Sequence, residues 1–490
     1  MPMSRGHAVP IVLLIILVSF STPIKAASQG SENDRLPWLK ASGRWIVDED
    51  GNFVLLRGAD YMGMEFGWFG HSEEDFERMR SWGFNVVRLP IAWSYVEPEE
   101  GYYDDSYLAT VDTVISWCRE NGLYVILDMH QWNWAPKFEG NGLPDWAVEQ
   151  YSDQDQAKFG FFTDTATQGK FFDMWRYVAD RFKGESTIFA YDIFNEPNVD
   201  YRLMSEGAFL EKLLTFYQGA TDHIREVDTR HAVMIEPPWG STVANGSVID
   251  DPNLVFSAHL YTEGTWDGIT GYDGNSTTLE EDFLVSYDFS AAWNVPLVIG
   301  EFGAGSAATK AHEWARDYMN IFDKYMTGAC WWSYWRDDDS MGLLTSNSEE
   351  KESLLSALIR IYPCRYNVTP TGTAYDIDAN YSKTDWYLDT EGSVVATFKI
   401  PPKIGGNFTK STNFETSSFT YDQDASELLV TLHGQGGGYV ELGQKPKEQI
   451  VEVVTRSVFR DPAFVLSLSL NIVLLLTVIV LRNKRMRTQK

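Results

Sequence analysis

The feature that most restricts the fold of this chain is an alternation of apolar, strand-like runs with longer amphipathic stretches. Strands that alternate with helical periodicity are typical of βα units and a parallel sheet. Eight such units predict an α/β fold with a closed (β/α)₈ TIM barrel over residues 36–363. An open doubly wound sheet is the alternative, but no glycine-rich phosphate loop follows the first run. The eight runs are Phe53–Asp60, Phe84–Ile91, Tyr124–Gln131, Ile188–Pro197, His231–Pro238, Leu254–Tyr261, Pro296–Gly303 and Cys330–Trp335.

The sequence changes character after Pro363. Short alternating runs such as Thr384–Leu388, Val394–Phe398, Ser418–Tyr421 and Leu428–Leu432 are separated there by glycine, proline, asparagine and aspartate. Alternation with turn residues at this spacing is typical of antiparallel strands. We therefore expect a small antiparallel β-sandwich over residues 364–444.

The two ends of the chain are apolar in different ways. Residues 1–26 have a basic Arg5, an apolar stretch and small residues at the end, which predicts a cleaved signal peptide. Residues 463–481 carry no charge, and a basic tail over residues 482–490 follows them. This arrangement predicts a charged stalk (445–462), one transmembrane helix (463–481) and a cytosolic tail, with a buried core helix as the alternative. The protein would be a single-pass type I membrane protein with its body extracellular or lumenal, at the cell surface or in the lysosome.

Charge and cysteine content exclude several classes of function. The chain has 40 Lys and Arg against 69 Asp and Glu, a formal charge of −29, which disfavours nucleic acid as a partner. Its three cysteines, Cys118, Cys330 and Cys364, allow at most one intramolecular disulfide and have no zinc-type spacing. Five sequons agree with a glycoprotein whose body lies outside the cytosol; their asparagines are Asn245, Asn275, Asn367, Asn380 and Asn407.

Polar and aromatic residues gather where the predicted strands end, which is the face that carries the active site in such barrels. Glu196 and Glu301 each end an apolar run, the fourth and the seventh of the eight. Two carboxyl groups suffice for glycoside hydrolysis, without a metal or a cofactor. Carboxyl groups on these strands are expected about 5–5.5 Å apart, a spacing that favours retention. We therefore assign Glu196 as acid/base and Glu301 as nucleophile.

Several motifs at these strand ends resemble glycoside hydrolase family 5. They are Arg88-Leu89-Pro90, Asp128-Met129-His130-Gln131, Asn195-Glu196-Pro197, His259-Leu260-Tyr261 and Glu301-Phe302-Gly303. Within that family the chain is similar to the endoglycosylceramidases, through Leu55-Leu56-Arg57-Gly58, Leu143-Pro144-Asp145-Trp146-Ala147 and the C-terminal sandwich. The resemblance implies cleavage of the β-glycosidic bond between an oligosaccharide and ceramide in glycosphingolipids.

The resemblance also implies roles for the neighbouring residues. Asn195 would bond the sugar 2-hydroxyl, while Arg88 and Tyr261 would hold Glu301. The glucose subsite would be lined by Asp128, His130 and His259, with Trp332 as its floor. The loop after the first strand departs from the family pattern because it is rich in aromatics and methionine (residues 61–69), so the glycan preference stays open.

Two other functions fit the same residues. A family 5 β-glucanase acting on polysaccharide would use the same two glutamates, and a catalytically silent surface lectin would keep the barrel for binding. A glycolipidase needs an apolar slot for the aglycone, whereas a glucanase needs further sugar-stacking sites. The residues themselves do not specify a need for an activator protein.

Overall fold

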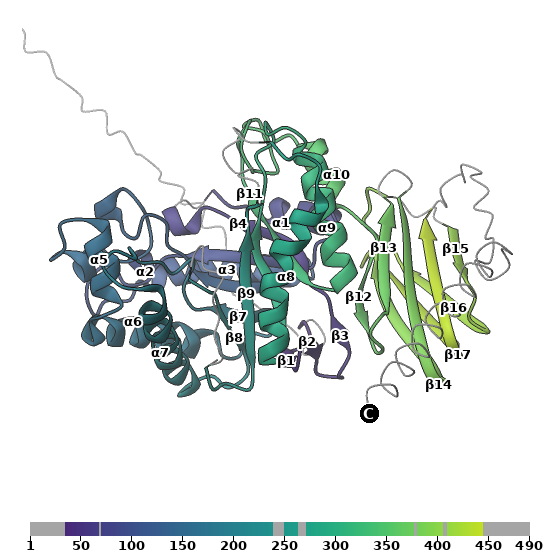
Figure 1. The fold of residues 1–490 in the computed structure, drawn as a ribbon, viewed down its shortest axis with the longest axis horizontal. Helices are drawn as coiled ribbons and strands as arrows, with labels where there is room; N and C mark the ends of the chain where they lie inside the picture. The colour runs from purple at the N-terminus through teal and green to yellow at the C-terminus, as the bar shows by residue number, and fades with distance from the viewer. Residues whose placement is uncertain are drawn as a thin grey trace, which may run out of the picture. The chain divides into compact units, whose positions relative to one another are not determined.

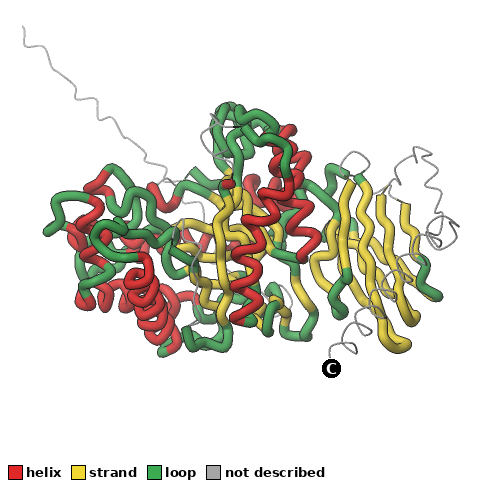
Figure 2. Tube along the Cα trace, in the orientation of Figure 1, coloured by secondary structure: helices red, strands yellow, loops and turns green. Residues whose placement is uncertain are grey.

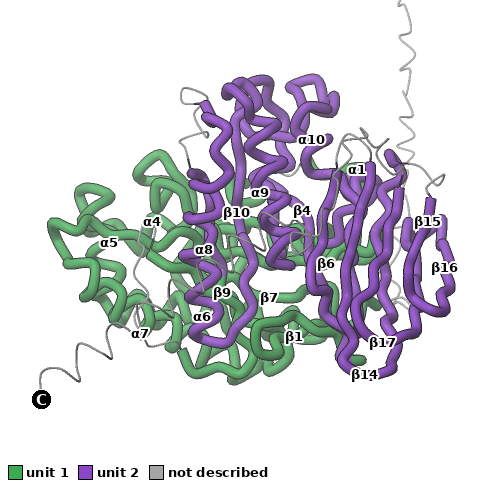
Figure 3. The backbone as a smooth tube through the Cα atoms, turned by 45° about the vertical axis from the view of Figure 1, so that its right-hand side comes forward, with its two compact units in different colours: residues 1–50, 63–76, 86–256 green, residues 51–62, 77–85, 257–490 purple. Residues whose placement is uncertain are grey.

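A computed structural model describes residues 35–67, 70–238, 249–262, 271–376, 380–404 and 409–443 of the 490-residue chain. The chain divides into two compact units (Figure 3). Unit 1 comprises residues 1–50, 63–76 and 86–256, and unit 2 comprises residues 51–62, 77–85 and 257–490.

The barrel has eight strands in the order β10-β11-β4-β5-β6-β7-β8-β9, which confirms the predicted TIM barrel. Every predicted run contains or overlaps one of these strands. Several strands are shorter than predicted, so that Asn195 and Glu196 follow β7 and Glu236 follows β8. The bounds are β4 (Arg57–Tyr61), β5 (Val86–Ile91), β6 (Tyr124–Met129), β7 (Ile188–Asp192), β8 (Ala232–Ile235), β9 (Leu254–Leu260), β10 (Leu297–Phe302) and β11 (Gly328–Tyr334).

Burial explains why these strands read as continuous apolar runs. All six residues of β5 and all six of β6 are buried, and the two strands pair in parallel from Val86 with Tyr124 to Ile91 with Met129. A parallel strand covered on both faces has no solvent side, so polar residues are excluded unless they have partners. Arg88 and Asp128 are therefore exceptions within these strands that call for a local explanation.

Helices connect the strands, and side-chain caps define where several of them begin (Figure 1). Asp104 accepts from the amides of Ser106 and Tyr107 at the start of α3, and Asp164 caps α6. Such caps each contribute about 1 kcal/mol. The bounds are α1 (Glu73–Ser81), α2 (Trp93–Val96), α3 (Asp105–Glu120), α4 (Asp145–Val148), α5 (Gln154–Phe161), α6 (Thr165–Phe182), α7 (Glu206–Arg225), α8 (Ser276–Trp293), α9 (Ala311–Tyr325) and α10 (Glu352–Leu358), with 3₁₀ turns η1 (Met64–Phe66) and η2 (Pro136–Phe138).

An antiparallel sheet occupies the region predicted as a β-sandwich (Figure 2). The predicted runs Thr384–Leu388 and Val394–Phe398 belong to one long strand, β14, which pairs with β17 and is irregular between Leu388 and Gly392. The early strand β3 also joins this sheet by pairing with β12. The bounds are β3 (Phe53–Val54), β12 (Tyr362–Tyr366), β13 (Gly372–Asp376), β14 (Tyr381–Lys399), β15 (Thr409–Thr412), β16 (Thr416–Asp422) and β17 (Glu427–Gly443), preceded by the hairpin β1 (Leu39–Ser42) and β2 (Trp45–Asp48).

The predicted signal peptide, stalk, transmembrane helix and tail all lie outside the described residues. Among the residues that the structure describes, a helix long and apolar enough to cross a membrane is not found. Asn275, Asn367 and Asn380 are exposed, while Asn245 and Asn407 lie outside the described residues. The cysteines Cys118, Cys330 and Cys364 are buried, and no disulfide joins them.

Candidate active site

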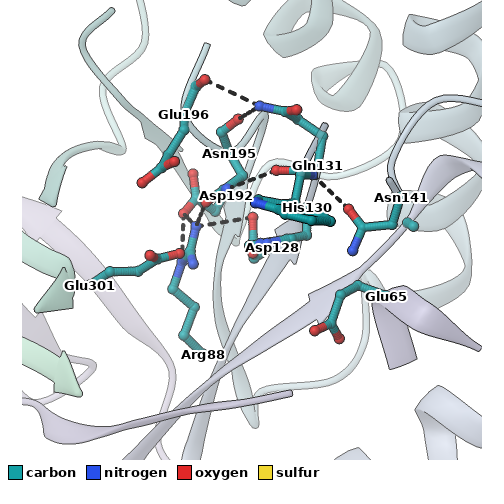
Figure 4. Close-up of polar contacts among 12 residues, drawn as sticks. Glu65, Arg88, Asp128, His130, Gln131, Asn141, Asp192, Asn195, Glu196 and Glu301 are labelled. Carbon is teal, nitrogen blue, oxygen red and sulfur yellow. Dashed lines mark hydrogen bonds and ion pairs between the residues drawn. The ribbon is translucent and has the colours of Figure 1, made fainter. Parts of the chain in front are cut away.

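Arg88 organises the part of the site that belongs to unit 1 (Figure 4). Its guanidinium group is fully buried and lies 3.0 Å from Asp128 Oδ1, 2.9 Å from Asp192 Oδ2 and 3.1 Å from Glu236 Oε1. It also donates to Asn195 Oδ1 at 2.8 Å. These partners stand at the ends of β6, β7 and β8, the strands that follow β5 around the barrel. A buried guanidinium needs this compensation, because an unpaired charge in the interior is strongly destabilising.

Glu196 sits on backbone that is held from two sides. Its φ of 45° lies in the left-handed region, which is uncommon for residues other than glycine. The Glu196 amide donates to Glu236 Oε2 at 2.8 Å, and Gln131 Nε2 donates to the carbonyls of Asn195 and Glu196 at 3.0 and 3.2 Å. Glu236 thus uses one oxygen for Arg88 and the other for Glu196, which couples the two residues.

Asp128 and His130 form a second buried pair beside this network. His130 Nδ1 lies 2.8 Å from Asp128 Oδ2, and the residue is only 4% exposed. Facing an ionised carboxylate, Nδ1 carries the proton and donates it to Asp128, which fixes the orientation of the ring. The pair therefore has a defined orientation before any ligand arrives.

Glu301 is the centre of the part of the site that belongs to unit 2. It lies in β10 and is 4% exposed. The Tyr261 hydroxyl donates to Glu301 Oε2 at 2.7 Å, and His259 Nδ1 lies 3.5 Å from the same oxygen. A hydroxyl donor stabilises the ionised carboxylate, the form that a nucleophile requires.

Glycines on either side of Glu301 allow close approach of its neighbours. A Cβ atom at Gly300 would stand 2.5 Å from Ser257 Oγ and 2.9 Å from His259 Nε2. At Gly303 it would stand 2.6 Å from the carbonyl oxygen of Trp332. Within the motif Gly300-Glu301-Phe302-Gly303, the two glycines thus allow β9 and β11 to pack closely against the strand that carries Glu301.

Within each unit the structure brings the predicted site residues together, and it adds others that were not predicted. Arg88, Asp128, His130, Asn195 and Glu196 cluster in unit 1, and Tyr261 and His259 contact Glu301 in unit 2. Trp332, predicted as the floor of the glucose subsite, is half-buried in β11 of unit 2. Arg88 has two further partners, Asp192 and Glu236, to which the sequence assigned no role in the site. Asp192 ends β7 and Glu236 follows β8, so both stand at strand ends, as Glu196 does.

Comparison with known proteins agrees with this architecture. A (β/α)₈ barrel with acidic side chains at its strand ends is typical of glycoside hydrolases. Residues 47–338 match the cellulase family, glycosyl hydrolase family 5, and the chain belongs to that family. It is a glycoside hydrolase that resembles the endoglycoceramidases of the family.

Individual relatives show how far the similarity extends. Endoglycoceramidase I of Rhodococcus hoagii is 24% identical over 387 residues, 69% of this chain and 75% of the relative. Endoglucanase C of Acetivibrio thermocellus is 24% identical over 314 residues, 54% of this chain and 84% of the relative. The solved structure of endo-glycoceramidase II from Rhodococcus sp. in complex with ganglioside GM3 matches with a TM-score of 0.69 and 25% identity, covering 82% of this chain and all of that one (100%).

Proposed function

We propose that this chain hydrolyses the bond between the oligosaccharide and ceramide of glycosphingolipids and releases the glycan intact. The observation that carries the proposal is the extent of the structural match to endo-glycoceramidase II, which covers 82% of this chain. The cellulase family match, by contrast, ends at residue 338, before β12 and the strands that follow it in the antiparallel sheet. The likeness to a glycolipid-cleaving enzyme thus extends beyond what the barrel alone requires.

The proposed mechanism uses Glu301 as nucleophile and Glu196 as acid/base. Both follow or end strands of one closed barrel, and the carboxyl ends of such strands meet at one rim. Glu301 attacks the anomeric carbon while the proton of Glu196 passes to the glycosidic oxygen, which leaves as the ceramide hydroxyl. Glu196 then takes a proton from water, whose oxygen displaces Glu301 and frees the glycan with retained configuration.

The surrounding residues prepare these two groups. Tyr261 supports the ionised form of Glu301 through its hydroxyl hydrogen bond. Arg88 fixes the Asn195 amide, which we assign to the 2-hydroxyl of the sugar at the cleaved bond. The subsite for this sugar would be lined by Asp128, His130 and His259, and Trp332 would form its floor.

Membrane attachment through residues 463–481 fits a lipid substrate. A single-pass anchor raises the effective concentration of the enzyme at the surface where glycolipid head groups stand. We therefore propose a type I membrane protein that acts on glycosphingolipids at the cell surface or in the lysosome.

The test is incubation of the full-length chain in detergent with a defined glycosylceramide and, separately, with a soluble β-glucan. Release of intact oligosaccharide together with free ceramide is the expected result. Hydrolysis of the glucan alone would contradict the proposal. The chain with Glu196→Gln serves as the matched inactive control in both reactions.

A β-glucanase is the second candidate, because Endoglucanase C is also a relative and the family is named for cellulases. It would use the same two glutamates on a soluble polysaccharide. The two candidates differ on the aglycone side, where ceramide requires an apolar surface and a glucan requires more sugar-stacking sites. Competition between the two substrates in one reaction ranks them directly.

A further inference from the structure

Glu65 is a fully buried carboxyl group, 0% exposed, that the proposed mechanism does not use. It lies in η1, shortly after β4, and its Oε2 accepts the amide of Gly63 at 2.7 Å. The other oxygen, Oε1, is buried and has no hydrogen-bond partner among the described residues. Because a buried carboxylate oxygen without a donor is costly, such an oxygen indicates a missing partner.

Asn141 presents the complementary group. It is 2% exposed, and its Oδ1 accepts the amide of Trp132 at 2.6 Å. That contact fixes the orientation of the side-chain amide, so Nδ2 is the donor end, and Nδ2 is buried without a partner in the described part of the chain. Figure 4 shows the Glu65 and Asn141 side chains on the same side of His130.

Electrostatics place Glu65 near the Asp128–His130 pair. Burial raises the pKa of the Glu65 carboxyl to about 7. The charge of His130 and hydrogen bonds from the backbone amides of Gly63 and Glu65 oppose this rise, and the charge of Asp128 adds to it. A carboxyl group that ionises near neutrality is easily held as the anion by a new donor. A ligand hydroxyl that donates to Oε1 would supply that donor.

We propose that Glu65 Oε1 and Asn141 Nδ2 together bind one hydroxyl group of the glycan beside His130, and so determine which sugar the enzyme accepts there. A hydroxyl has one proton to donate and lone pairs to accept, which matches one carboxylate oxygen and one amide N–H. This inference deepens the proposed function, because it takes the ligand to be a sugar. A site built to bond a hydroxyl discriminates strongly against an analogue that lacks it.

The experiment uses the full-length chain with Glu301→Ala, so that sugars bind without turnover. Cellobiose, lactose and their monodeoxy analogues are titrated by calorimetry into this chain and into the same chain with Glu65→Ala. We expect one monodeoxy analogue to bind about tenfold more weakly than its parent when Glu65 is present. With Glu65→Ala, that analogue and its parent should bind equally.

Three variants control the experiment. Glu65→Gln keeps the shape of the side chain and replaces Glu65→Ala if that variant unfolds. Asn141→Asp keeps the acceptor for the Trp132 amide but removes the donor. Both variants should weaken discrimination against the same analogue. Glu97→Gln is the matched control, because Glu97 is also a buried glutamate (2% exposed) but both of its oxygens accept, from Trp93 Nε1 at 2.8 Å and from the Gly101 amide at 2.7 Å. It should leave sugar discrimination unchanged. Thermal unfolding confirms that each variant is folded.

Two outcomes would overturn the inference. In one, deletion of each hydroxyl has the same effect with and without Glu65, as expected if Oε1 and Nδ2 are satisfied by a buried water. In the other, none of these sugars binds. Cleavage of glycosylceramide is measured separately, so a chain that cleaves the lipid but discriminates independently of Glu65 contradicts only this inference. A chain that discriminates through Glu65 but releases no ceramide contradicts only the proposed function.

Discussion

At the scale of single residues, Glu196 illustrates how much support one carboxylate needs. Its left-handed backbone conformation (φ 45°) is a strained one for a residue with a side chain. The strain persists because Glu236 and Gln131 hold the amide and carbonyl groups around it. The contacts of Glu236 and Gln131 therefore fix the backbone from which the Glu196 side chain extends.

Replacement of Glu236 by glutamine tests this support. A glutamine has one acceptor oxygen, whereas Glu236 accepts from both Arg88 and the Glu196 amide, so one contact must be lost. We expect a loss of about 1–3 kcal/mol in the free energy of unfolding and at least a tenfold lower kcat. Urea unfolding and turnover of an aryl glycoside measure the two effects. Glu226→Gln, at an exposed ion pair with Arg176, should change neither.

Replacement of Glu301 by alanine tests the nucleophile. Turnover should fall by a factor of about 10³ or more, because the covalent intermediate can no longer form. Azide should restore activity by occupying the vacated space and should yield a product of inverted configuration. A rescued product that retains configuration would remove Glu301 from the nucleophile role. Nuclear magnetic resonance of the anomeric proton distinguishes the two products.

At the scale of elements, two features depend on a neighbouring strand: the continuity of β14 and the glycine at position 300. The periodicity of the sequence predicts all eight barrel strands, but it misses the continuity of β14, because the turn-like residues 389–392 form an irregularity within a strand that stays paired to β17. Turn residues indicate a break only where no neighbouring strand continues the pairing. Gly300 shows the same dependence on a neighbour, since nothing local to β10 requires a glycine there.

We expect Gly300→Ala to push β10 away from β9. The added Cβ would stand 2.5 Å from Ser257 Oγ and 2.9 Å from His259 Nε2, so these side chains or the strand that carries Glu301 must shift. Overpacking of this kind costs about 1–3 kcal/mol, and kcat should fall with it. Gly169→Ala in α6 is the matched control, because among the described residues no atom beyond its chain neighbours and its own helix backbone lies within 4 Å of the added Cβ. This variant should be neutral or stabilising. Equal stability and activity of the two variants would contradict this account.

At the scale of the whole molecule, the proposed anchor separates catalysis from access to the substrate. A chain ending at residue 462 should be secreted into the medium and should cleave detergent-dispersed glycosylceramide as fast as the full-length chain. Its rate on glycosylceramide in vesicles should fall at least tenfold, because tethering no longer concentrates it at the lipid surface. Cell fractionation and the two rate assays measure these effects. Retention of the shortened chain in membranes would argue against the anchor.

The sequence by itself determined the barrel and the positions of its two glutamates. Strands buried on both faces leave a local apolar pattern in the sequence. The ends of these strands form the active-site rim, so the rim can be located from the sequence alone. Only the tertiary structure decided the partners of Arg88, such as Glu236, which is 148 residues away. The same holds for Glu65 Oε1 and Asn141 Nδ2, which have no partner in the part of the chain that the structure describes. The physical reason is that contacts between distant side chains depend on chain packing, which leaves no periodic trace in the sequence around either residue.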